Sequence, residues 1–399
     1  MHNVDITIVG AGSAGLTLAL LLARLPLKIA LLEKGPEPEA GMADYRRVSA
    51  LNLASQRVLQ RVGAWDGIVA SAAAYQQMQV WEADSFASIS FDAASQQLPA
   101  LGWICDNEQI RQQLYMQLKK HTNVSCYFNC AINQLNQGER DVLLNINEQQ
   151  LLLTRLLVGA DGVNSFVRQQ QHMPLFHWDY DHQAIVAVIR TTEPHQATAR
   201  QVFLPEGPLA LLPLPDQNLC SIVWSTTPQR AAELIAMEDT AFNQALTAAS
   251  QTVLGLAEVQ GIRQQFPLKM RYVGEWVKGK VVLVADAAHS IHPLAGQGMN
   301  LGLMDVAALA ELIGQQITDE KALNEPRILR QYERWRKAEA QTMIATMELF
   351  KRGFTSKQPL LKLVRAVGMK AFDQLPLLKK KVIDSALGNS GDLPEIARL

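Results

Sequence analysis

The stretch that decides the fold runs from Val4 to Glu33 and reads VDITIVGAGSAGLTLALLLARLPLKIALLE. An apolar run ends in a glycine-rich turn, and a helical run of Ala and Leu follows over residues 16–25. A second apolar run over residues 28–33 ends in an acid. The pattern predicts a strand, a helix and a second strand, with the G-x-G-x-x-G spacing at the first turn. This arrangement is typical of a dinucleotide-binding βαβ unit.

Each glycine of the turn has its own physical task. Gly10 lets the strand turn sharply into the helix, and Gly15 lets that helix pack closely on the strand. Gly12 lacks a Cβ atom, so a pyrophosphate can approach the backbone, and the free N–H groups at the helix start attract its charge. Glu33 stands where such units keep a carboxylate for ribose hydroxyls. The motif alone leaves FAD and NAD as alternatives.

The composition is that of a globular protein with a large interior. The chain has 399 residues, 48% hydrophobic and 19% charged, which is enough for two or three domains. A net charge of −1 gives no electrostatic basis for binding nucleic acid. Arg24, Pro26 and Lys28 interrupt the apolar stretch near the N-terminus, which favours a soluble, cytoplasmic protein over a signal or membrane anchor. Four cysteines without paired spacing predict reduced, buried thiols and no metal site: Cys105, Cys126, Cys130 and Cys220.

Beyond the first unit, the pattern of apolar residues predicts a second domain inserted into the first. Short alternating runs over residues 75–91 break the α/β rhythm, and later strands over residues 184–224 are expected to complete the same sheet. Residues 327–386 predict a basic helical tail, either a packed cap with a solvated face or a surface for a membrane or partner protein. Helices are expected over residues 55–62, 107–118 and 227–256, and strands over residues 124–128, 131–135, 142–146, 151–154, 156–158 and 266–272.

Two later aspartates follow apolar strands in the same way as the glycine turn. Asp161 ends a Gly-Ala-Asp-Gly turn, where an open α/β sheet places its ligand crevice; the motif alone favours an ordinary helix cap. Asp286 follows a strand over residues 281–284 and precedes a Pro/Gly loop and a long apolar helix over residues 301–313, with Gly314 as its C-cap. The start of that helix suits a flavin ring, whose pyrimidine edge becomes negative on reduction.

Two pairs of basic or imidazole side chains leave alternatives open. Arg46 and Arg47 are read either as a solvated helix start or as arginines that reach back to the cofactor phosphates. His289 and His292 lie three residues apart in a Pro/Gly loop with few carboxylates nearby, which favours structural histidines over a metal pair.

Taken together, the three separated motifs resemble the single-component flavin aromatic hydroxylases, the para-hydroxybenzoate hydroxylase superfamily. Within it, the chain is similar to the ubiquinone-biosynthesis hydroxylases that act on a polyprenylated phenol. The similarity is strong in residues 47–52, 80–81, 84–86, 89–92, 178–180, 199–203, 219–225 and 292–298, and it extends to residues 392–395. The resemblance covers essentially the whole chain.

The resemblance implies an α/β fold with a Rossmann-like FAD-binding domain, an inserted β-sheet substrate domain and a C-terminal helical region. The FAD-binding domain is expected to be discontinuous over residues 1–74, 100–178 and 274–330, the substrate domain to cover residues 75–99 and 179–273, and the helical region to cover residues 331–399.

The resemblance also assigns cofactor contacts by position. The glycine turn would hold the FAD pyrophosphate, Glu33 the adenosine ribose and Asp286 the ribityl chain, while Asp161 belongs to a motif that serves both FAD and NAD(P)H. The family usually has Gly-Asp where this chain has Ala285-Asp286, and we expect the extra methyl group to tighten the approach to the ribityl chain. The full set of expected FAD contacts is Gly10, Gly12, Ser13, Ala14, Gly15, Glu33, Lys34, Arg47, Arg111, Asp161, Asp286, Pro293, Gly296, Gly298, Met299 and Asn300.

The implied reaction is an aromatic-ring monooxygenation in ubiquinone biosynthesis. NAD(P)H reduces the flavin, O₂ adds to give a C4a-hydroperoxide, and the phenol ring takes the distal oxygen. An apolar channel for the prenyl chain is expected along Val80, Phe203, Leu211 and Trp224, although each also suits plain core packing. Tyr180 and His182 are conceivable acid–base groups, and no catalytic residue is assigned.

Other functions remain open from the sequence. The same scaffold suits another flavin oxidoreductase, such as a reductase of isoprenoid double bonds or a halogenase. A flavin-binding scaffold subunit of the ubiquinone-biosynthesis complex is the alternative from outside the enzymes. Peripheral contact with the inner membrane, contacts with other ubiquinone-biosynthesis proteins and a homo-oligomer are the partner interactions that we keep in view.

Overall fold

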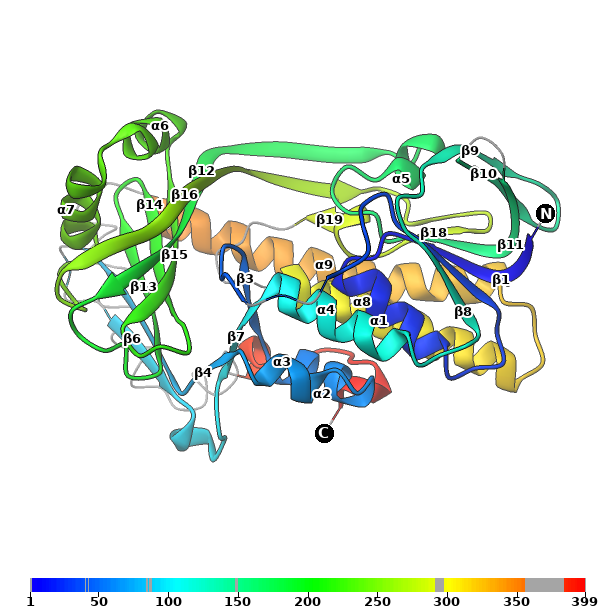
Figure 1. Cartoon of the computed structure of the whole chain (residues 1–399), viewed down its shortest axis with the longest axis horizontal. Coiled ribbons are helices and arrows are strands. Elements are labelled where there is room, and N and C mark those ends of the chain that lie inside the picture. The colour runs from blue at the N-terminus through cyan, green and yellow to red at the C-terminus, as the bar shows by residue number, and fades with distance from the viewer. Residues whose placement is uncertain are drawn as a thin grey trace.

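The computed structural model describes residues 2–39, 41, 43–83, 85, 88–147, 150–290, 298–355 and 384–398. The chain forms two lobes that lie side by side and are bridged by two long strands (Figure 1). The larger lobe contains the described chain ends, and the smaller lobe is a sheet with helices on its outer side (Figure 1).

The larger lobe is built on a sheet in the order β17-β18-β11-β1-β2-β8. The strands from β18 to β8 run parallel, and their apolar side chains are buried because helices cover the sheet. Their bounds are β1 His2–Val9, β2 Ile29–Leu32, β8 Val124–Tyr127, β11 Gln150–Gly159, β17 Val277–Lys278 and β18 Val281–Leu283. The expected βαβ unit is confirmed: α1 (Ser13–Leu22) connects β1 to β2, which pair in parallel.

A meander extends this sheet, as the sequence predicts. Strands β9 (Ile132–Gln137) and β10 (Val142–Ile146) run antiparallel to each other, and β10 pairs with the first half of β11. The two strands expected over residues 151–154 and 156–158 are one continuous strand, β11. Arg155 between them does not break it, because its exposed side chain points to solvent while Thr154 and Leu156 on either side pair with β1.

Helices pack on this sheet and on one another. α1 is buried along almost its whole length, since it packs against the sheet, α4 (Asn107–Leu118) and α8 (Gly298–Thr318). Three short strands, β3 (Val48–Leu51), β4 (Ala73–Tyr75) and β7 (Gly102–Asp106), form a second small sheet. The remaining helices of this lobe are α2 (Leu53–Arg61), α3 (Trp65–Val69), α5 (Phe166–Gln170) and α9 (Pro326–Thr355).

The expected C-cap at Gly314 is wrong. α8 begins at Gly298 and continues through Gly314 to Thr318. The glycine is overruled by its neighbours, because Gln316 is buried and Ile317 packs against the core, so that the last turn is held by tertiary contacts.

Replacing Gly314 with alanine is therefore expected to stabilise the protein. A Cβ atom at this position would meet nothing within 4 Å, and alanine in a helix interior is favoured over glycine by up to about 1 kcal/mol. Chemical denaturation measures the gain. The matched control is Gly302→Ala in the same helix, where the new Cβ atom would lie 2.8 Å from the Ala285 Cβ atom. We expect that control to lose stability, and equal effects at both sites would contradict this account.

The smaller lobe is built on a sheet in the order β19-β16-β12-β15-β14-β13-β5-β6. The prediction that a later block of strands completes the sheet begun near Tyr75 is confirmed, because β5 pairs in parallel with β13. The expected helical stretch over residues 227–256 is two helices, because the chain becomes extended at Met237 and Glu238. The elements are β5 Gln77–Glu82, β6 Ser88–Asp92, β13 Thr198–Leu204, β14 Gly207–Pro213, β15 Leu219–Thr226, α6 Pro228–Ala236 and α7 Asp239–Ala249.

Two long antiparallel strands join the lobes. β12 (Leu175–Thr191) and β16 (Ala257–Val273) pair along most of their length and run from one lobe into the other (Figure 1). At its far end β16 also pairs with β19 (His289–Ser290), just after Asp286. The domain boundary expected near residue 179 thus lies within β12, and the division into domains stays a prediction.

The described part of the C-terminal region packs onto the larger lobe. Residues 356–383, the central part of the expected helical tail, lie outside the described residues. The segment that follows contacts α2 and α9: the amide of Ala54 donates to the carbonyl of Leu387, Arg57 to Asn389 Oδ1, and Trp335 Nε1 to the carbonyl of Asp392 at 2.8 Å. These contacts favour a packed cap for residues 384–398. No helix in the described ranges is long and apolar enough to cross a membrane.

Candidate cofactor and substrate site

The three sequence motifs meet at one edge of the large sheet. Strands β1, β11 and β18 are parallel neighbours, so their carboxyl ends lie together. The Ala160 amide donates to the carbonyl of Val9 at 2.8 Å, and the Val284 amide donates to the carbonyl of Gly159 at 3.0 Å. Gly10, Asp161 and Asp286 therefore follow three adjacent strands, although they are far apart in the sequence.

The glycine turn has the geometry that a pyrophosphate requires. Gly10 has a φ of +105°, and a Cβ atom there would lie 2.4 Å from the carbonyl oxygen of Ala160. A Cβ atom on Gly15 would lie 1.9 Å from the carbonyl oxygen of Gly10, so the helix approaches the turn too closely for any side chain. In contrast, a Cβ atom on Gly12 would meet nothing within 4 Å. α1 begins here without a side-chain cap, which leaves N–H groups facing this open space for a phosphate.

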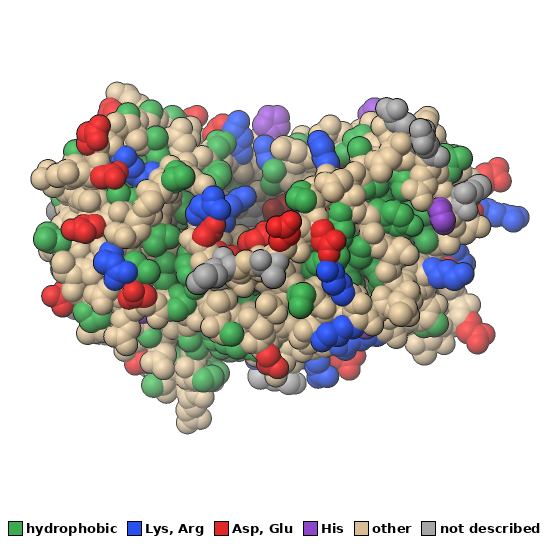
Figure 2. All heavy atoms as spheres, in the orientation of Figure 1, with side chains coloured by type: hydrophobic (Ala, Val, Ile, Leu, Met, Phe, Trp, Pro, Cys, Tyr) green, Lys and Arg blue, Asp and Glu red, His purple; other side chains and the backbone are tan. Residues whose placement is uncertain are grey.

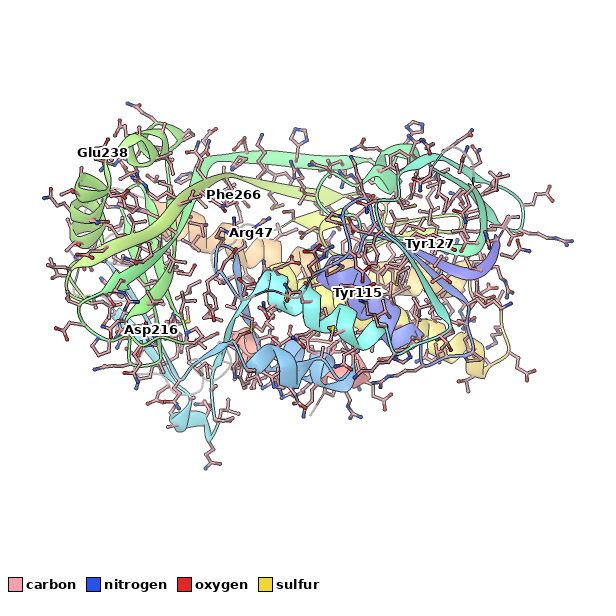
Figure 3. The ribbon with its side chains drawn as sticks, viewed as in Figure 1. Arg47, Tyr115, Tyr127, Asp216, Glu238 and Phe266 are labelled. Atoms are coloured by element: carbon pink, nitrogen blue, oxygen red, sulfur yellow. The ribbon has the colours of Figure 1, made fainter. Side chains whose placement is uncertain are left out.

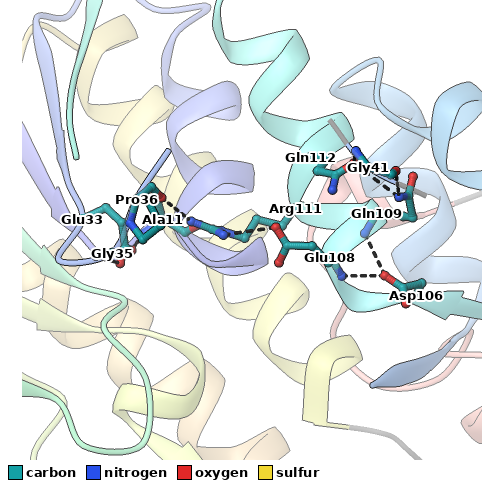
Figure 4. Close-up of polar contacts among 10 residues, drawn as sticks. All are labelled: Ala11, Glu33, Gly35, Pro36, Gly41, Asp106, Glu108, Gln109, Arg111 and Gln112. Atoms are coloured by element: carbon teal, nitrogen blue, oxygen red, sulfur yellow. Dashed lines mark hydrogen bonds and ion pairs between the residues drawn. The ribbon is translucent and has the colours of Figure 1, made fainter. Parts of the chain in front are cut away.

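Glu33 and Arg111 hold the amide and the carbonyl of Ala11, in two successive peptide groups of this turn (Figure 4). Glu33 Oε2 accepts from the Ala11 amide at 2.6 Å, while its Oε1 accepts from the Gly35 amide at 2.7 Å. Arg111 Nε donates to the Ala11 carbonyl at 3.0 Å. Both side chains thus fix the backbone that faces the open space. Direct contact of Glu33, Arg111 or the exposed Lys34 with FAD stays a prediction.

Asp161 supports the start of α5 beside this turn. Ser165 is the N-cap residue, whereas Asp161 Oδ1 accepts from the Ser165 hydroxyl at 2.5 Å and its Oδ2 from the Val167 amide at 3.1 Å. Burial raises the pKa of Asp161, and the hydrogen bond from Ser165 opposes that shift. Arg168 extends the link, because it donates to the carbonyl of Ala287 at 3.0 Å, beside Asp286. A role of Asp161 toward cofactors stays a prediction.

Asp286 is the free carboxylate of the site. It accepts no hydrogen bond from any described residue, and its side chain keeps contact with solvent. The surrounding protein nevertheless raises the pKa of Asp286 through burial, and the nearby His289, Arg47 and Arg271 oppose that shift. A carboxylate that is open to solvent yet flanked by basic groups suits the hydroxyls of a ribityl chain.

Arg47 faces the other lobe. Its guanidinium carbon lies 5.1 Å from the centre of the Phe266 ring on β16 (Figure 3). The alternative of a helix start is wrong, because the pair precedes strand β3 and not a helix. The two arginines differ in role: Arg46 Nη2 lies 2.5 Å from Asp44 Oδ2 at the surface, whereas Arg47 stands between the lobes.

The start of α8 is tied to the β3–α2 connection. Asn300 Oδ1 accepts from the Asn52 amide at 3.1 Å and from the Ser55 hydroxyl at 2.7 Å, and its Nδ2 donates to the carbonyl of Ala50 at 2.8 Å. Asn300 is buried, and Gly298 and Met299 precede it in the first turn. Their expected contacts with the flavin stay predictions. Pro293 and Gly296 lie outside the described residues.

The two faces of the small sheet have different environments. The outer face is buried against α6 and α7, and it includes Leu211 and Trp224, whose ring centre lies 6.3 Å from that of Phe242. The expectation that Leu211 and Trp224 line a channel is therefore wrong, and both are core residues. We define the inner face as the half-buried row that shares a side with Phe266: Val80, Gln201, Ala210, Val223, Val186 and Gln264, of which only Gln201 is fully buried.

The inner face looks toward the larger lobe. Phe266 belongs to it and contacts Arg47, and Phe203 lies two residues beyond Gln201 on the same side. Figure 2 shows a hollow between the two lobes with acidic and basic side chains around it. The inner face and the ends of β1, β11 and β18 are therefore the two sides of one site.

Tyr180 and His182 both contact other groups of the protein, and an acid–base role for either stays a prediction. The Tyr180 side chain is buried, and its hydroxyl lies 3.2 Å from the sulfur of Met270. The His182 ring nitrogens face two backbone carbonyls, with Nδ1 2.7 Å from the Tyr180 oxygen and Nε2 3.1 Å from the Glu206 oxygen. Both residues lie where the pairing of β12 with β16 is irregular, between Asp179 and Gln183.

The sequence motifs do not include Asp305, a buried carboxylate that contacts two buried basic side chains. Its Oδ2 lies 2.6 Å from His289 Nε2, and its Oδ1 accepts from Arg336 Nε at 2.8 Å, with all three side chains buried. Burial alone would raise the pKa of Asp305, but His289 and Arg336 outweigh it and the pKa is lowered. A lone carboxylate in the uncharged stretch of α8 from 298 to 310 is the signal that could have found it.

His289 has the structural role that the sequence favours, and His292 lies outside the described residues. Within the described ranges, no group of three or more His, Cys, Asp or Glu side chains is placed to hold a metal ion. The four cysteines are free thiols; Cys105, Cys130 and Cys220 are buried as expected, and Cys126 is half-buried.

Ala285 adopts a backbone conformation that favours glycine. Its φ is +52°, and its amide donates to Asp305 Oδ2 at 3.1 Å. A left-handed alanine costs about 1–2 kcal/mol, and the greater flexibility of unfolded glycine offsets about half of this.

We expect Ala285→Gly to stabilise the apoprotein by about 0.5–1 kcal/mol. Thermal and chemical unfolding measure the change. Ala288→Gly is the matched control in the same turn, because Ala288 has a φ of −94° and gains nothing from glycine. A loss of stability in both variants would show that the strain at Ala285 is negligible.

Comparisons with known proteins agree with this geometry. A family model described as an FAD binding domain matches residues 3–347. The chain is 33% identical to the ubiquinone biosynthesis monooxygenase COQ6, mitochondrial, of Xenopus tropicalis, over 95% of this chain and 92% of that protein. It is also 33% identical to the 3-demethoxyubiquinol 3-hydroxylase of Escherichia coli, over 96% of this chain and 98% of that protein.

A solved structure shows the same fold at low sequence identity. The p-nitrophenol 4-monooxygenase PnpA from Pseudomonas putida superposes with a TM-score of 0.78 at 17% identity, over 97% of this chain and 99% of that chain. The predicted architecture, a Rossmann-like α/β unit with an inserted sheet, is confirmed.

Proposed function

Because the chain belongs to the FAD binding domain family and, within it, to the ubiquinone-biosynthesis hydroxylases, we propose that it hydroxylates the aromatic ring of a polyprenylated phenol. The enzyme is an FAD-dependent monooxygenase. The observation that carries the proposal is the meeting of Gly12, Asp161 and Asp286 at one sheet edge, opposite the inner face.

The residues present fit FAD. The open space before Gly12 and the uncapped start of α1 would receive the pyrophosphate, and Asp286 would accept hydrogen bonds from the ribityl hydroxyls. Arg47 would place a positive charge near the cofactor from the side of the small sheet. When bound, FAD supplies the redox chemistry: it takes electrons from NADH or NADPH and activates O₂ for transfer to the ring.

The inner face suits a prenylated ring. Val80, Val186 and Val223 are apolar and half-buried, whereas Gln201 and Gln264 offer amide groups along the same row. Such a surface orients a ring hydroxyl, packs against the prenyl chain and excludes water from the reacting carbon. Because polyprenylated substrates dissolve in membranes, we propose a cytoplasmic enzyme that works at the membrane surface, beside other ubiquinone-biosynthesis proteins.

A demethoxyubiquinol is the second candidate substrate. The Escherichia coli relative bears that activity in its name and aligns along nearly its whole length. Both substrates present a hydroxylated ring with a prenyl chain, so they would use the same inner face.

The test supplies purified, FAD-loaded protein with NADH or NADPH and O₂, together with a prenylphenol or a demethoxyubiquinol. We expect substrate-accelerated bleaching of the visible flavin band and a product heavier by one oxygen atom, whose regiochemistry identifies the ring carbon. Reduction without oxygenated product would favour another flavin oxidoreductase. Bound FAD that NAD(P)H does not reduce, with or without substrate, would favour a scaffold subunit.

A further inference from the structure

We propose that Asp305 is a positioning residue that holds the Asp286 turn in the shape that binds FAD, with Arg336 on α9 as its outer anchor. The inference rests on the proposed function, since it concerns the same cofactor site. It assigns a task to the buried carboxylate that the expected FAD contacts do not include.

The Asp305 carboxylate binds both ends of the turn that contains Asp286. Asp305 Oδ2 accepts from the Ala285 amide at 3.1 Å and lies 2.6 Å from His289 Nε2. These two contacts bracket Asp286, which itself accepts no hydrogen bond from a described residue. The direction of the Asp286 side chain is therefore set by the residues on either side of it.

The turn needs these two contacts because its backbone is strained. Ala285 has a φ of +52°, and a left-handed alanine persists only where its surroundings impose it. The close approach of Gly302 on α8 and the hydrogen bond from the Ala285 amide to Asp305 impose it here. Without Asp305, we expect Ala285 to relax toward an ordinary backbone conformation and to carry Asp286 with it.

Helix α9 holds Asp305 in place through Arg336. Arg336 Nε donates to Asp305 Oδ1 at 2.8 Å, and both side chains are almost completely buried. The positive charge keeps the buried carboxylate ionised, so Asp305 can accept all three contacts at once. The same helix holds the strand before the turn, because the Tyr332 hydroxyl donates to the carbonyl of Leu283 at 3.1 Å.

His289 connects Asp305 to the sheet of the smaller lobe. Its ring centre lies 5.0 Å from that of the buried Trp276, and its backbone pairs with Tyr272 at the end of β16. Asp305 therefore fixes the Asp286 turn relative to the strand that carries Phe266 on the inner face. A shift of the turn would alter the position of a bound flavin relative to the substrate.

The experiment separates positioning from stability. In the first variant, Asp305→Asn, we expect FAD affinity to fall at least tenfold, measured by fluorescence titration of the apoprotein. In the second, Asp305→Leu combined with Arg336→Met, no buried charge is left unpaired, so we expect the melting temperature to recover toward that of the unchanged protein. FAD affinity in the second variant should stay at least tenfold weakened.

A third variant tests the strain directly. Ala285→Gly in the Asp305→Asn background should restore part of the FAD affinity, because glycine adopts the left-handed conformation without the contacts of the Asp305 carboxylate. Glu311→Gln is the matched control, because it removes a carboxylate from the same helix. Glu311 Oε2 accepts from the Glu395 amide, far from the turn. We expect that control to bind FAD normally.

The outcomes distinguish the two proposals. If FAD affinity recovers together with stability in the Leu/Met variant, Asp305 is only structural and the inference is overturned. Failure of Ala285→Gly to restore any affinity would overturn it as well. If the unchanged protein binds FAD but oxygenates no substrate, the proposed function fails while the binding comparison of the variants still decides the role of Asp305.

Discussion

A Gly12→Val variant is expected to fold normally and to lose at least a hundredfold in FAD affinity, about 3 kcal/mol of binding free energy. The reason lies in the open space around Gly12, where an added Cβ atom would meet nothing within 4 Å. Because the Cβ atom meets open space, we expect a branched side chain to cost the fold little and to exclude the pyrophosphate. Fluorescence titration with FAD and thermal unfolding of the apoprotein measure the two effects.

The contrasting variant is Gly15→Ala. Its Cβ atom would lie 1.9 Å from the Gly10 carbonyl oxygen, which belongs to the backbone and cannot rotate away. We expect a loss of about 3 kcal/mol or more of stability, because α1 must move away from β1. If Gly12→Val bound FAD as well as the unchanged protein does, the pyrophosphate would have to bind elsewhere.

An Asp286→Asn variant is expected to raise the stability of the apoprotein at neutral pH and to weaken FAD binding at least tenfold. Burial raises the pKa of Asp286. A carboxyl group with a raised folded-state pKa contributes its full stability below its unfolded pKa of about 3.9, and that stability is lost as the pH rises through the folded value. At pH 7 the ionised Asp286 carboxylate therefore destabilises the folded state, and asparagine removes this destabilisation.

The pH dependence makes this expectation specific. The gain in melting temperature should be present near pH 7 and should shrink as the pH falls toward about 4, where the unchanged carboxyl becomes protonated. Asp319→Asn is the control, since Asp319 is exposed and pairs only with Lys321 among the described residues. A variant that gained no stability but bound FAD normally would remove Asp286 from the cofactor site.

Much of this architecture is predictable from local sequence. Helix α4 begins and ends where the sequence predicts, because Asp106 caps it by accepting from the amides of Glu108 and Gln109. Strand β10 has its expected bounds over 142–146 as well. The three aspartate and glycine motifs are recognisable because each follows an apolar strand, and parallel strands bring their ends together.

The errors arise where distant residues decide. Alternation along β14 and β15 shows which residues share a face, but both faces are apolar, so only packing against α6 and α7 shows that Leu211 and Trp224 lie on the outer side. Gly314 resembles a helix end, yet tertiary packing of Ile317 continues the helix. Asp305 reveals its role only when α9 places Arg336 beside it.

The two long strands β12 and β16 connect the lobes through a ladder of backbone hydrogen bonds. The β12–β16 ladder, although irregular between Asp179 and Gln183, is extended by the pairing of β16 with β19, so we expect the lobes to resist opening more than lobes on a flexible linker would. The separation between flavin and ring carbon would then be built in rather than reached by closure. Engineers who wish to change which ring is accepted could exchange side chains of the inner face and leave the cofactor distance unchanged.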